Sequence, residues 1–286
     1  MKLLVLVLLL VQDPTVDQLI RQLGADDVDD RNQATHELRK RGIDMLPRLR
    51  EAAESKDAEV VARAREVLGL ILEDFGQSTL RSFEHALDKA PSLVIYSRAS
   101  TPKDPTVRFT GQGRLLRKPG GKIRITSEGV VSDETWNALL VSDGERMMLE
   151  TQAGRSGQRD WGYDGKDYWP TVRAAAARVA VLNSAHIWAY VRIEETPIAE
   201  LFVLGTWKQG AEGKLRTLEY SISWRGKESL PVPNPTHAKV WYDPTTFRPI
   251  KRLLTFSFNK AEPQVLEQFD YETDISENVL RVPEGK

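Results

Sequence analysis

Several short segments in the second half of the chain alternate strictly between apolar and polar residues, and this pattern limits the fold more than any other feature. In one segment the alternate positions are Leu218, Tyr220, Ile222 and Trp224. The stretches 254–258 and 265–271 follow the same rule. A period of two gives a strand one apolar face and one polar face. Such strands predict an antiparallel sheet that packs against apolar material on one side.

Turn signals separate the predicted strands from about residue 91 onward. Pro119-Gly120-Gly121, Asp143-Gly144 and Asp164-Gly165 each lie between apolar stretches and predict hairpins. An alanine-rich stretch, 172–190, predicts a helical interruption, and one more helix is expected between Gly76 and Pro91. We therefore expect an open, incomplete barrel with covering helices over residues 77–286.

The preceding residues, 14–76, show helical periodicity instead. Six pairs of positions carry matching residues 30 positions apart: Val16 and Leu46, Leu19 and Leu49, Leu23 and Ala53, Asp27 and Asp57, Ala34 and Ala64, Leu38 and Leu68. A fixed period of this size indicates stacked helical hairpins. Four helices are expected, the second ending at Gly42, the third with Asp44 as N-cap and Pro47 in its first turn, and the fourth beginning at Asp57.

The segment Asp57-Ala58-Glu59-Val60, followed by Ala64 and Leu68, resembles the second helix of a HEAT repeat. Two repeats are fewer than such arrays usually need to be stable alone, so we expect this segment to dock on the following domain. It either binds a protein partner or serves as an accessory buttress, and the sequence favours neither.

The N-terminus predicts export. Lys2 precedes the apolar run Leu3–Val11, which is too short to span a bilayer and is followed by Gln12, Asp13 and Pro14. Residues 1–13 are therefore interpreted as a signal peptide, the alternative being a buried first strand. The chain has no cysteine, which excludes disulfides, zinc–thiolate sites and an N-terminal lipidated cysteine. Its net charge of −1 gives no reason to expect a nucleic-acid partner.

Within the predicted sheet, the run 240–250 is similar to the strand–turn–strand of LolA/LolB-like lipoprotein carriers. There a strand ends in Asp-Pro, here Asp243-Pro244, and resumes after a proline, here Pro249. The stretches 90–93, 139–144 and 268–283 resemble that family's opening helix end, central hairpin and closing segment. The resemblance implies an α+β fold in which an open antiparallel half-barrel, with helices as a lid, encloses a cavity for acyl chains.

The expected function is the non-catalytic binding of a lipid or acylated protein by an exported periplasmic or envelope protein. The candidate ligand-binding residues are Trp136, Leu140, Tyr220, Ile222, Trp224 and Phe256. No G-x-S-x-G, H-E-x-x-H or phosphate-binding glycine loop occurs, so no enzyme activity, cofactor or metal is expected. The alternative is an interaction scaffold that uses the helical repeat and carries no lipid.

Overall fold

The computed structural model describes residues 14–101, 109–131, 134–153, 156–163, 202–224, 235–256 and 262–283. The chain divides into two compact units, one up to Phe75 and one from Gly76. We call them the helical unit and the sheet unit. The predicted signal peptide, the Asp164-Gly165 turn and the 172–190 helix lie outside the described residues. No helix among those described is long and apolar enough to cross a membrane.

The helical unit contains short helices joined by tight turns. Its elements are α1 (Val16–Gln22), α2 (Val28–Arg41), the 3-10 helix η1 (Gly42–Met45), α3 (Leu46–Ala52) and the first part of α4 (Ala58–Asp88). Two of the pairs related by the 30-residue period, Leu19 with Leu49 and Ala34 with Ala64, are fully buried, each residue being at most 1% exposed. The predicted helix pairs are therefore present, and the resemblance to HEAT repeats stays a prediction.

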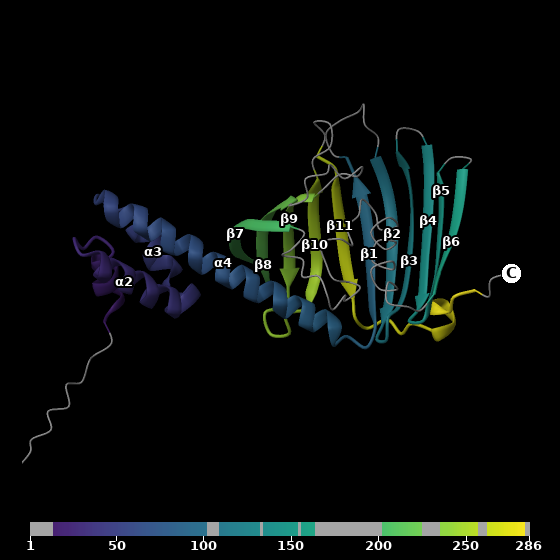
Figure 1. The fold of residues 1–286 in the computed structure, drawn as a ribbon, viewed down its shortest axis with the longest axis horizontal. Coiled ribbons are helices and arrows are strands. Elements are labelled where there is room, and N and C mark those ends of the chain that lie inside the picture. The colour runs from purple at the N-terminus through teal and green to yellow at the C-terminus, as the bar shows by residue number, and fades with distance from the viewer. Residues whose placement is uncertain are drawn as a thin grey trace, which may run out of the picture. The chain divides into compact units, whose positions relative to one another are not determined.

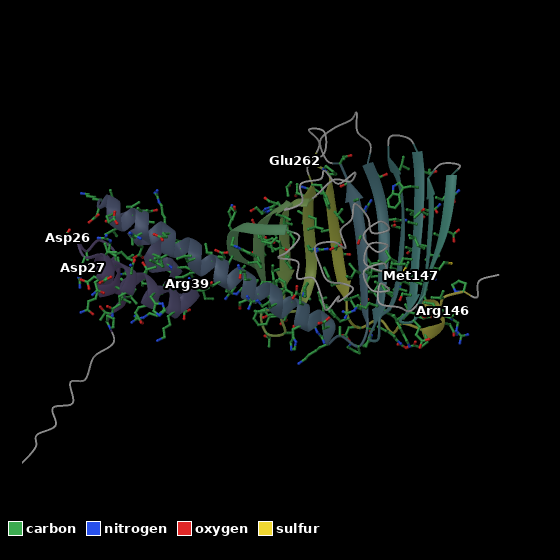
Figure 2. All side chains as sticks on the ribbon, in the orientation of Figure 1. Asp26, Asp27, Arg39, Arg146, Met147 and Glu262 are labelled. Atoms are coloured by element: carbon green, nitrogen blue, oxygen red, sulfur yellow. The ribbon has the colours of Figure 1, made fainter. Side chains whose placement is uncertain are left out.

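Helix caps follow the same period. The carboxylates of Asp27 and Asp57 accept hydrogen bonds from backbone N–H groups at the starts of α2 and α4, at 2.8 Å from Asp29 and 2.9 Å from Glu59. Figure 2 shows Asp27 in this part of the chain. The predicted cap at Asp44 is wrong. A 3-10 turn, η1, precedes α3, which places Met45 at the N-cap without a side-chain hydrogen bond.

Helix α4 is continuous over 31 residues, which corrects the prediction of two helices separated at Gly76. A glycine inside a helix costs about 1 kcal/mol relative to alanine, which a long and well-packed helix tolerates. In the sheet unit Gly76 is required by packing, because a Cβ there would come within 2.1 Å of the Trp207 ring.

The sheet unit is built on one antiparallel sheet of eleven strands (Figure 1). The strands are β1 (Leu93–Ser100), β2 (Phe109–Lys118), β3 (Lys122–Val131), β4 (Glu134–Asp143), β5 (Arg146–Ala153), β6 (Ser156–Tyr163), β7 (Phe202–Glu212), β8 (Leu215–Trp224), β9 (Pro235–Tyr242), β10 (Pro249–Phe256) and β11 (Gln264–Asp270). Their order is β6-β5-β4-β3-β2-β1-β11-β10-β9-β8-β7, with β6 and β7 at the two ends. The described strands therefore form an open sheet, and the predicted α+β class is confirmed.

Part of each face of the sheet is covered, one face by α4 and the other by the C-terminal segment. The last turns of α4 pack on one face, where the Phe83 and Tyr242 rings meet edge to face at 4.9 Å and Arg117 donates to the Leu87 carbonyl at 2.9 Å. On the opposite face, the C-terminal segment with the 3-10 helix η3 (Glu277–Leu280) buries Leu280 against β1 and β2. The predicted turns 119–121 and 143–144 join β2 to β3 and β4 to β5 as expected.

Candidate functional site

The strand register separates the residues of the sheet into an apolar face and a polar face. One row of mutually paired positions crosses the sheet through Tyr220, Ala238, Leu254, Val265 and Ala99. All five are at most 3% exposed. Directly opposed residues in an antiparallel pair point to the same side, so this row defines the apolar face, the one against which α4 packs.

Five predicted ligand-binding residues have described side chains, and all five lie on the apolar face. Leu140 and Phe256 are fully buried, Tyr220 and Ile222 are at most 4% exposed, and Trp136 is half-buried. Trp224 ends β8 opposite Phe202, and its side chain lies outside the described residues.

These residues form two groups and not one cluster. Trp136 and Leu140 lie on β4, whereas Tyr220 and Ile222 lie on β8. Seven strand spacings separate β4 from β8 in the sheet order, which amounts to roughly 33 Å along the sheet. Any ligand that touches both groups must therefore be long, or the two groups serve separate ends of the face.

Small residues occupy the part of the apolar face between the two groups, close to β4. They are Ser97, Ala99, Gly111, Gly113, Ser127, Gly129 and Ala138, which pair with one another across β1 to β4. Strand interiors favour β-branched and aromatic residues, and glycine there often marks a close approach by another group. At Gly129 the approaching group is the indole of Trp136, since a Cβ would lie 2.7 Å from its Nε1.

An ion pair is buried within this face. Arg252 Nε and Nη2 both lie 2.5 Å from Glu267 Oε2, and both side chains are fully buried. Burying a charged pair costs desolvation energy, so such a pair often adds little to the stability of the fold. It is therefore a candidate for a role in function or in selecting one folded structure. This ion pair was not predicted from the sequence. Glu267 nevertheless alternates with the apolar Val265 and Phe269, a signal that could have placed it on this face.

Three further polar atoms on this side of the sheet are buried and lack a hydrogen-bond partner in the described part of the chain. They are the indole Nε1 of Trp136, the indole Nε1 of Trp207 and the amide Oε1 of Gln209. An unpaired buried donor costs about 1–3 kcal/mol. Two indole N–H donors, one near each end of the face, thus have no acceptor among the described residues.

Trp207 and Tyr220 form an aromatic wall at the β7–β8 end. Their ring centroids are 5.2 Å apart, and Trp207 sits at an irregularity in β7 where Thr206 has a positive φ of 51°. Burial raises the pKa of Tyr220 to about 12, so its hydroxyl stays protonated at neutral pH. This end of the face is therefore aromatic, and the described charges that act on Tyr220 are those of Arg252, Glu267 and Glu84.

A separate hollow of about 710 Å³ contains none of the six predicted residues. Most of its lining residues belong to the polar face, including Tyr96, Arg98, Gln112, Arg114 and Glu128, and the small residues Ser97, Gly113, Ser127 and Ala138 also contribute to it. The Arg114 guanidinium lies 5.4 Å from the centre of the Tyr96 ring, and Gln112 donates to Glu128 at 2.5 Å. These side chains engage one another, and their polarity does not suit an acyl chain.

The sequence matches no protein-family model. No curated protein matches it either. Among solved structures, the chain is similar to LprF from Mycobacterium bovis, with a TM-score of 0.34 and 11% identity over 69% of this chain and 92% of that one. It is also similar to a DUF1329 family protein from Desulfovibrio piger, with a TM-score of 0.29, and to a LolA superfamily protein from Nitrosomonas europaea, with a TM-score of 0.28. Each of these matches has 9% identity and covers 72% of this chain and 97% of the other. At these TM-scores the likenesses assign neither a family nor a function to the chain.

Proposed function

We propose that the apolar face of the sheet unit binds a lipophilic ligand, a lipid or the acyl chain of an acylated protein, without catalysis. One observation carries the proposal: the five predicted residues with described side chains all lie on one face of an open sheet, with small residues between the two groups. The side chains between the two groups are small, and those of the two groups are mostly large and apolar.

The energetics favour a long apolar ligand. Burying a methylene gains about 0.8 kcal/mol before the cost of association, so half of a long acyl chain supports micromolar binding. The Trp136 and Trp207 indoles offer N–H donors without partners in the described residues, and an ester carbonyl matches them. A lipid with ester groups therefore fits both the apolar and the polar features of the face.

Native mass spectrometry of protein purified without detergent tests the proposal. We expect lipid adducts on the wild-type chain that are lost or reduced in Ile222→Asp. The matched control is Ser223→Asp, because residue 223 follows on the same strand and is exposed. If no adduct is found and no added fatty acid binds, the proposal fails and the interaction-scaffold alternative stands.

The proposal places the protein in the periplasm or elsewhere in the cell envelope. It rests on the charge and apolar run of residues 1–13, and we expect cleavage near Gln12 or Asp13. N-terminal sequencing of protein from the native envelope fraction tests it. Intact Met1 on protein from the soluble cytoplasmic fraction would contradict it.

A further inference from the structure

A groove of about 580 Å³ lies within the sheet unit, between the end of α4 and the turn that joins β9 to β10. Eight residues line it: Arg81, Ser82, His85, Ala86, Lys89, Thr246, Phe247 and Arg248. The groove is distinct from the apolar face, because none of these residues is among the sheet positions that define that face.

The groove is rich in basic side chains. Arg81 and His85 lie four residues apart on one side of α4, and Lys89 follows one residue after the helix ends. Arg248 lines the groove from the turn that joins β9 to β10. None of the four forms an ion pair within the described residues. The neighbouring carboxylate of Asp88 bonds instead to Arg117 at 3.1 Å. No acidic residue is among the described residues that line the groove, and the carboxylate of Asp243, on the turn side, interacts electrostatically with Arg248.

The turn holds its side of the groove in a fixed shape. Asp243 Oδ1 accepts hydrogen bonds from the backbone N–H groups of Thr245 and Thr246, each at 2.8 Å. Phe247 adopts a positive φ of 55° and stacks on Tyr242 with ring centroids 5.8 Å apart. The Arg248 guanidinium is held 5.0 Å from the centre of the Tyr271 ring. Arg248 is thereby positioned before any ligand arrives.

We propose that this groove binds a phosphate group, carried either by the head group of an anionic phospholipid or by a soluble phosphate ester. Several basic side chains that converge on one hollow from two elements suit a compact anion with several oxygen acceptors. A phosphate in the groove would receive hydrogen bonds from Arg81, Lys89 and Arg248, with the Thr246 hydroxyl as a further neighbour. The proposal is independent of ligand binding on the apolar face.

Vesicle co-sedimentation and calorimetry of the full chain test the proposal. The vesicles are phosphatidylcholine with or without phosphatidylglycerol, and the soluble probe is glycerol phosphate. The test variant is Arg81→Glu with Lys89→Glu. The control, Lys208→Glu with Lys214→Glu, makes the same change of charge at exposed lysines of the same unit outside the groove.

We expect binding of at least one probe to weaken by about tenfold or more in the test variant and to change little in the control. Selective binding to phosphatidylglycerol vesicles identifies a head group as the source of the phosphate, and binding of glycerol phosphate alone identifies a soluble ester. Equal losses in the two variants, or no binding of either probe by the wild-type chain, would overturn the proposal. Circular dichroism of both variants establishes that they fold.

Discussion

The indole of Trp136 lies against Gly129 on the neighbouring strand, at a distance that leaves no space for a side chain at position 129. A Cβ there would come within 2.4 Å of the Thr110 carbonyl oxygen and 2.7 Å of the Trp136 Nε1. The glycine therefore sets the position of the indole, and with it the position of an N–H donor that has no partner in the described residues. The absence of a side chain at position 129 thus makes space for the Trp136 indole on the apolar face.

Replacing Gly129 by alanine should displace the indole and destabilise the sheet unit. Because the nearer contact is a backbone oxygen, we expect a loss of about 1–3 kcal/mol in the free energy of unfolding, measured by urea denaturation. Gly157→Ala is the control, since its Cβ would lie 3.7 Å from the nearest neighbouring atom, the backbone oxygen of Thr151. Equal effects of the two substitutions would contradict the packing interpretation.

Replacing each of two glycines of α4 by alanine should have different effects on thermal stability. Gly76→Ala places a Cβ within 2.1 Å of the buried Trp207 ring and should lower the melting temperature. Gly69→Ala meets nothing within 4 Å and should be neutral or stabilise the helix by up to about 1 kcal/mol. Thermal unfolding followed by circular dichroism measures both. A Gly76→Ala variant as stable as Gly69→Ala would show that Trp207 is not packed as described.

The buried pair Arg252–Glu267 should behave as a coupled unit. Glu267→Ala leaves a buried guanidinium without its carboxylate, and we expect a loss of about 3–5 kcal/mol. The double variant Arg252→Met with Glu267→Leu removes both charges and should recover most of that loss, because apolar residues suit this face. Urea denaturation of the singles and the double gives the coupling energy. If the losses of the two single variants simply add in the double variant, the two side chains are not coupled.

The turn beside the basic groove should contribute stability that depends on pH. Hydrogen bonds from the Thr246 and Thr245 N–H groups lower the pKa of Asp243 below its ordinary value of 3.8. A lowered pKa means that the contribution is present above the unfolded value and is lost as pH falls through the folded value. The difference in unfolding free energy between wild type and Asp243→Ala should be full at neutral pH and shrink below about pH 4. A difference that stays constant to lower pH would refute this role.

Several local patterns predicted the structure correctly, although the predicted cap at Asp44 and the predicted helix break at Gly76 were wrong. Alternation placed Tyr220, Ile222 and Phe256 on one face, and the turn at Asp143-Gly144 appeared where the dipeptide predicts it. The 30-residue period pairs Asp27 with Asp57, and in the structure both carboxylates cap the starts of helices. Each of these inferences needs only neighbouring residues and the geometry of a helix or a strand.

Features that depend on distant parts of the chain were not predicted. The first strand pairs with the last, so that Ser97 lies opposite Glu267, and no local signal encodes this pairing. The glycine at position 76 of α4 packs against Trp207, which is more than a hundred residues away in the chain. The basic groove likewise joins the end of α4 to Arg248, and it appears only once both elements are placed.

Displacement of a fluorescent fatty-acid probe is the most direct test of the central claim, that the apolar face binds a lipophilic ligand. Phe256→Asp and Thr255→Asp introduce the same charge at adjacent positions of β10, the first on the apolar face and the second on the polar face. Trp136→Phe, which keeps an aromatic ring and removes the N–H donor, is a milder variant that keeps the test valid if Phe256→Asp does not fold.

We predict saturable probe binding by the wild-type chain and Thr255→Asp, weaker binding by Trp136→Phe, and none by folded Phe256→Asp. Absence of saturable binding to the wild-type chain, or equal binding by all the folded variants, would contradict the claim.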